Sequence, residues 1–192
     1  MSNLFLFLKK KIEITEQTFV HFAILTFVII WHTIAIELLI TKTEGRIHMA
    51  SIFDVAKYIL HTQGKMSTWK LQKLCYYSQA WALAWTETPI FDEDFEAWAN
   101  GPVCPELFYI HKGLFSVGEQ DIRRGNIDNL SDDEIDTINI VLKDYGNMAP
   151  YDLRELSHKE DPWKNARGTL PEGASCNVTI TKSSMGDYYG SL

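Results

Sequence analysis

Three groups of side chains in this sequence have types and spacings that would suit catalysis. The first is His158, Glu160 and Asp161, which are close enough in sequence to act as metal ligands or as an acid–base pair. A metal site needs further ligands, however, and no second pair stands at a suitable spacing. The simpler interpretation is that His158 and Asp161 bond free backbone groups at helix ends.

Cys75 is the second candidate, as a nucleophile that pairs with a distant histidine. It falls on the apolar face of a predicted helix, which favours core packing instead. The third group is acidic, and its members could act as paired carboxylates: Asp92, Glu93, Asp94 and Glu96. Such crowding between two apolar helical segments is more typical of a solvated turn.

The common motifs for phosphate binding and hydrolysis are absent from the sequence. It contains no G-x-x-x-x-G-K-[ST], G-x-G-x-x-G, G-x-S-x-G or H-E-x-x-H. Its three cysteines, Cys75, Cys104 and Cys176, include no C-x-x-C pair. This argues against a zinc ribbon or a disulfide framework and favours free thiols in a reducing compartment. We therefore predict no catalytic residue, no metal and no cofactor.

Aromatic residues offer a different kind of site. Trp81, Trp85 and Trp163 fall on predicted apolar helix faces, as core residues do. Trp69 and Trp98 do not, and an exposed tryptophan is a frequent anchor for a protein partner. The predicted partner-binding residues are Trp69, Trp98, His158 and Trp163.

Charge limits the choice of partner. The chain has 192 residues and a formal charge of -7. Residues 49–192 carry thirteen Lys/Arg and twenty-one Asp/Glu, so the body is acidic. General nucleic-acid binding depends on neutralising phosphates, so no nucleic-acid partner is expected. With 46% hydrophobic and 22% charged residues, the composition is that of a globular protein.

Residues 1–48 are an extension of a different character. The segment from Phe19 to Ile40 is long enough to cross the roughly 30 Å apolar core of a bilayer, although His21, His32 and Glu37 interrupt it. One interpretation is an inner-membrane anchor, and another is a helix that packs on the domain. The favoured one is an over-extended gene start, with a cytoplasmic protein that begins at Met49.

Hydrophobic periodicity predicts a compact, mainly α domain over 49–192 with a possible small β-hairpin, preceded by the apolar N-terminal helix. The helix from Ser67 to about Thr86 is expected to be central, because Tyr76 and Tyr77 widen its apolar face. The other helices are expected over 52–62, from Pro102 or Pro105 to about 114, over 131–145, 150–156 and 162–167, and weakly over 180–192. A strand is expected over 95–99, and 119–130 is expected to be a hairpin or a loop with a short strand.

Four blocks in order carry a resemblance to a known family. They are Phe53–Leu60, Lys70–Trp81, Glu96–Leu107 and Leu156–Arg167. Together they resemble the Panacea domain, the family of SocA-like antitoxins and phage-associated proteins. Residues 1–48 lie outside this pattern.

The resemblance implies a helical, non-enzymatic protein that binds and neutralises a cognate protein toxin encoded beside it. It also implies a possible second partner, a bacterial protease to which an adaptor of this family delivers its toxin. The alternatives from the residues alone are a membrane-tethered regulatory protein, with the membrane as partner only if residues 19–40 are expressed, and an enzyme that uses His158 and Asp161.

Overall fold

The computed structural model describes residues 30–34, 49–171 and 173–192. Contacts divide the chain into two units, Met1–Ile47 and His48–Leu192. In the first unit residues 30–34 are helical, and the remainder of the span predicted from Phe19 to Ile40 lies outside the described residues. Within the described ranges, no helix combines the length and apolar character that crossing a membrane requires.

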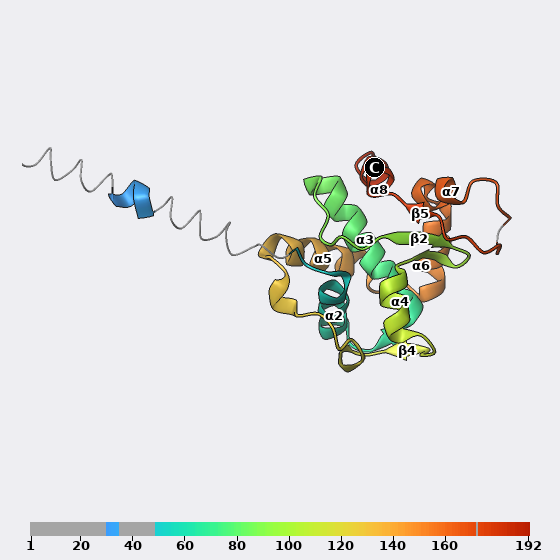
Figure 1. Ribbon diagram of the computed structural model, residues 1–192, viewed down its shortest axis with the longest axis horizontal. Coiled ribbons are helices and arrows are strands. Elements are labelled where there is room, and N and C mark those ends of the chain that lie inside the picture. Colours follow the sequence, from blue (N-terminus) through green and yellow to red (C-terminus); the bar gives the residue numbers. More distant parts are fainter. Residues whose placement is uncertain (1–29, 35–48, 172) are drawn as a thin grey trace, which may run out of the picture. The chain divides into compact units, whose positions relative to one another are not determined.

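The second unit is mainly helical, as predicted (Figure 1). Its helices are α2 (Ile52–Gln63), α3 (Thr68–Thr86), α4 (Pro105–His111), α5 (Asp132–Tyr145), α6 (Pro150–Lys159), α7 (Asp161–Arg167) and α8 (Lys182–Tyr189). Its strands are β1 (Met66–Ser67), β2 (Phe95–Trp98), β3 (Gly101–Val103), β4 (Ser116–Val117) and β5 (Thr179–Ile180). Two 3₁₀ turns, η1 (Glu119–Asp121) and η2 (Ile127–Asn129), occupy the region in which a strand was predicted, and that prediction was wrong.

Helix α3 is the centre of the domain, with α2, α5 and α8 packed around it (Figure 1). Ser67 caps it by accepting a hydrogen bond from the amide of Lys70, and Glu87 ends it in a left-handed conformation. Its buried residues include Tyr76 and Tyr77 together with polar side chains that no apolar stripe would include. The helix is therefore covered on nearly all sides rather than along one face.

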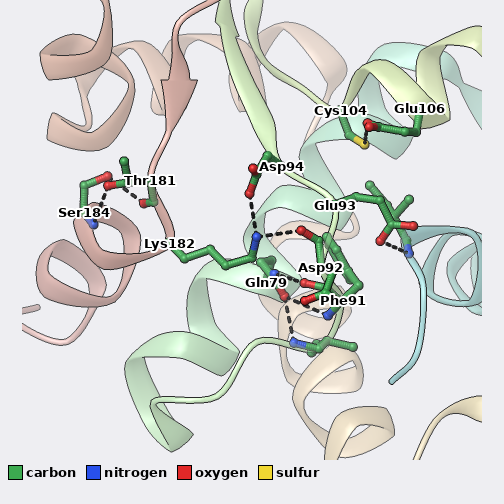
Figure 2. A network of polar contacts seen from close by, with 12 residues as sticks. Gln79, Phe91, Asp92, Glu93, Asp94, Cys104, Glu106, Thr181, Lys182 and Ser184 are labelled. Carbon is green, nitrogen blue, oxygen red and sulfur yellow. Dashed lines mark hydrogen bonds and ion pairs between the residues drawn. The ribbon is translucent and has the colours of Figure 1, made fainter. Parts of the chain in front are cut away.

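Two of these polar side chains, Gln72 and Gln79, hold loops against α3. They lie seven residues apart and therefore on the same side of the helix. Gln79 accepts from the amide of Ile90 at 2.8 Å and donates to the carbonyl of Phe91 at 2.7 Å (Figure 2). Gln72 makes the equivalent pair of bonds to both backbone groups of Cys104. Each side-chain amide thus provides hydrogen-bond partners for buried N–H and C=O groups of a loop that has no neighbouring strand at that point.

Strands β2 and β3 form the small hairpin, and β5 pairs with the other edge of β2. Pro102 lies in β3 opposite Ala97, so its predicted place in a helical first turn was wrong. Pro105 does begin α4. The reason for the difference is Gly101, whose φ of 97° reverses the chain after the turn at Ala99 and Asn100 and returns it as a strand.

The acidic turn before β2 connects distant elements (Figure 2), although Asp92 and Asp94 on it are exposed. Glu93 accepts from the amide of Ile52 at 3.1 Å and so satisfies the start of α2. Lys182, at the start of α8, donates to the carbonyl of Asp92 and to the carboxylate of Asp94. The first and last helices of the domain therefore both attach to this turn.

Candidate functional site

A groove of about 780 Å³ opens between the first turns of α3, the β2–β3 hairpin and α4. Helix α3 contributes Trp69 and Lys73, the hairpin contributes Trp98, and α4 contributes Phe108. The segment that leads into β5, residues 175–177, closes another side. Two of the four predicted partner-binding residues, Trp69 and Trp98, therefore line the same groove.

The walls of the groove are aromatic and their edge is exposed. The Trp98 ring meets the Phe108 ring edge to face, with centroids 4.9 Å apart. The Trp98 indole N–H donates to the Glu96 carboxylate at 2.6 Å, which fixes the ring in place. Beyond Leu114, which lines the groove, Phe115 is 88% exposed, and Tyr109 next to Phe108 is also exposed. Such exposure of large apolar side chains is typical of an interaction surface.

His111 also lines the groove and belongs to a polar network with Gln72. The bonds to Cys104 orient the Gln72 amide, so its nitrogen donates to Nε2 of His111 at 3.1 Å. Nε2 is thus an acceptor and the ring is neutral. Burial lowers the pKa of His111, which agrees with this assignment. The network supports the shape of the groove and supplies no free base to it.

Lys73 is the most unusual polar residue of the lining. Its side chain is buried, with 2% of the residue exposed, and its ammonium donates to the carbonyl of Pro102 at 3.0 Å. Burial, and then the nearby charge of Arg154, lower the pKa of Lys73 to about 7. Among the described residues, no carboxylate forms an ion pair with it. A buried amine with one acceptor is therefore part of the groove.

The other two predicted partner-binding residues, His158 and Trp163, are not part of the groove lining, and Trp163 contacts the β2–β3 hairpin instead. The His158 and Trp163 rings stack with centroids 3.8 Å apart, and Trp163 is buried. The Trp163 indole donates to the carbonyl of Trp98 at 3.0 Å, and the Arg167 guanidinium lies over the Trp163 ring. Arg167 also donates to the carbonyl of Ala97 at 2.9 Å. This stack holds the hairpin that carries Trp98.

The residues considered for catalysis are not brought together. Cys75 is fully buried, and burial raises the pKa of its thiol, which disfavours the nucleophilic thiolate. Asp161 forms an exposed ion pair with Lys164, while Glu160 rather than Asp161 occupies the cap position of α7. Over residues 30–34, 49–171 and 173–192, no three His, Cys, Asp or Glu side chains form a metal-sized cluster.

The sequence pattern did not indicate the roles of Gln72, Lys73, His111 and Arg167. The first two fall beside the apolar stripe of α3 and read as surface positions under a one-faced pattern. The available signal was indirect, because a helix that is apolar almost all round implies that its few polar positions are also enclosed.

The fold and the site together define a mainly helical domain with an aromatic surface groove. Residues 71–164 match the model of the family described as antitoxin SocA-like, Panacea domain. The resemblance to the Panacea family is thus confirmed over that segment, which includes most of α3, the hairpin and α4. Comparisons with curated proteins and with solved structures found no match.

Proposed function

We propose that this protein is an antitoxin-type interaction protein that binds and neutralises a protein toxin encoded by a neighbouring gene. The observation that carries the proposal is the aromatic groove, most of whose lining residues, Trp98 and Phe108 among them, lie in the segment that matches an antitoxin family. Trp69 is 49% exposed in its lining, and Phe115, which follows the lining residue Leu114, is 88% exposed. Aromatic anchors of this kind contribute most of the binding free energy in many protein interfaces.

The test is co-expression of the full chain with the adjacent open reading frame. We expect the neighbour to inhibit growth alone and the pair to grow and to copurify. A harmless neighbour, or inhibition without a complex, would contradict the proposal. A toxin whose level falls only in cells that hold an active bacterial protease would add the adaptor role.

Trp69→Ala is the variant that tests the groove, and Trp85→Ala is its matched control. Trp85 is 47% exposed and stacks on Trp81 at the far end of α3, away from the groove. We expect Trp69→Ala to weaken the complex at least roughly tenfold, because truncating an interface tryptophan often costs about 2 kcal/mol or more. Trp85→Ala should bind like the native protein. Equal losses in both variants would place the interface elsewhere.

A further inference from the structure

The groove contains one charged group, the Lys73 ammonium, whose hydrogen-bonding capacity the domain uses only in part. The Lys73 ammonium has three N–H donors, and one of them bonds to the Pro102 carbonyl. No further hydrogen bond joins this ammonium to the described residues, and the charge that helps to lower its pKa, that of Arg154, is also positive. A buried cation without a carboxylate is costly, so an anion that reaches it would be strongly favoured.

Glu96 is the opposing charge in the lining, and it has less to gain from a partner. It is half-buried rather than buried, and it already accepts the Trp98 indole hydrogen bond at 2.6 Å. Water reaches such a carboxylate and screens it, so a cation brought to it would contribute little. The groove therefore favours an anionic group over a cationic one.

We propose that the groove binds a segment of the partner in which an aspartate or glutamate side chain lies beside a large apolar residue. The carboxylate pairs with Lys73, and the apolar residue packs between Trp69 and Trp98. This inference rests on the proposed function, because it names the chemistry by which that same groove recognises the toxin. It also runs against the acidic charge of the whole chain, so the contact must be local and short-ranged.

Blocked peptides test the charge preference directly. The probes are acetyl-Leu-Glu-Leu-amide and its Gln and Lys counterparts, which differ in the charge of one side chain. Binding to the full chain is measured by ligand-observed NMR at pH 6.5 and about 150 mM salt, at which general repulsion is screened. We expect the Glu peptide to bind about tenfold more tightly than the Gln peptide, as for a charge-assisted hydrogen bond. Equal affinities, or a preference for the Lys peptide, would overturn the inference.

A fourth probe, acetyl-Leu-Gln-Leu with a free carboxyl terminus, separates side-chain recognition from capture of a chain end. Tighter binding of this peptide than of the blocked Glu peptide would overturn the commitment to a side chain. Lys73→Met should remove the difference between the Glu and Gln peptides, while Lys65→Met, an exposed control on the preceding loop, should preserve it.

Proton uptake gives a readout that does not depend on the folding of a variant. Calorimetry of the native chain at pH 7.5 in two buffers of different ionisation enthalpy should show up to one proton taken up per Glu peptide bound. If binding of the Glu peptide takes up no more protons than binding of the Gln peptide, and both values are zero, pairing with Lys73 is contradicted. A toxin complex without charge preference overturns this inference alone, whereas charge preference without a toxin complex overturns the proposed function.

Discussion

At the scale of single residues, the least expected feature is a carboxyl group surrounded by tyrosines. Glu160 is buried and accepts hydrogen bonds from the hydroxyls of Tyr189 at 2.6 Å and Tyr77 at 3.1 Å. Burial raises the pKa of Glu160 to about 7 despite these two donors. The tyrosine pKa values rise as well, so their hydroxyls stay protonated and available to donate. The junction of α6 and α7 is thereby joined to α3 and α8.

Glu160→Gln should change how stability depends on pH. The folded pKa of Glu160 lies above its ordinary value of 4.5, so the folded state takes up a proton between about pH 4.5 and 7. The native free energy of unfolding should therefore fall as pH rises through this window. Relative to the native protein, Glu160→Gln should gain about 2 kcal/mol between pH 5 and 8. Urea unfolding at both values measures the gain.

The control for this prediction is Glu87→Gln, an exposed position after α3. Its stability difference from the native protein should stay within about 0.5 kcal/mol at the two pH values, as for most surface substitutions. A constant difference for Glu160→Gln would mean that Glu160 is ionised in the folded state throughout.

At the scale of elements, the predictable features were those with local causes. The end of α2 followed from Gly64 and the start of α3 from Ser67, and the capping box of Ser131 and Glu134 marked the start of α5. Strand β3 was missed because its cause is a partner strand rather than its own three residues. The groove was missed for a similar reason, since its walls come from α3, the hairpin and the segment before β5. The sequence signal for the groove was the position of Trp69 and Trp98 outside the predicted apolar helix faces.

Gly101→Ala tests how tightly the hairpin and α3 fit together. A Cβ on Gly101 would lie 2.5 Å from Cε of Lys73 and 2.9 Å from Oγ of Ser157. We expect a loss of about 2 kcal/mol beyond that of Gly64→Ala, because overpacking is added to the cost of a positive φ. Gly64 is the matched control, with φ of 76° and no atom within 4 Å of an added Cβ. Thermal unfolding of both variants measures the difference. Equal losses of stability would show that the hairpin shifts to accommodate the added Cβ without cost.

At the scale of the whole molecule, the family match and the folded unit differ in extent. The match covers residues 71–164, whereas α2 and α8 lie outside it and both pack on α3. Helix α8 brings Tyr189 against Tyr76, Tyr77 and Trp81, with ring centroids 5.3 to 6.3 Å apart. It also fixes the acidic turn through Lys182. We therefore expect the unit of stability to be larger than the matched segment.

Fragments of the chain measure that unit. Residues 49–192 should unfold cooperatively, since their contacts form one unit. A fragment of residues 49–180 lacks α8, which removes the Tyr189 ring from Tyr76 and Tyr77 and the Tyr189 hydroxyl from Glu160. Each buried aromatic side chain that is lost contributes roughly 3 kcal/mol to the free energy of unfolding. Losing several such contacts would remove much of a typical domain stability of about 5–15 kcal/mol. We expect this fragment to lose cooperative unfolding and to bind a hydrophobic dye, while a fragment that lacks only Ser191 and Leu192, both exposed, behaves like 49–192. Cooperative unfolding of 49–180 at native stability would show that α8 is an appendage rather than part of the core.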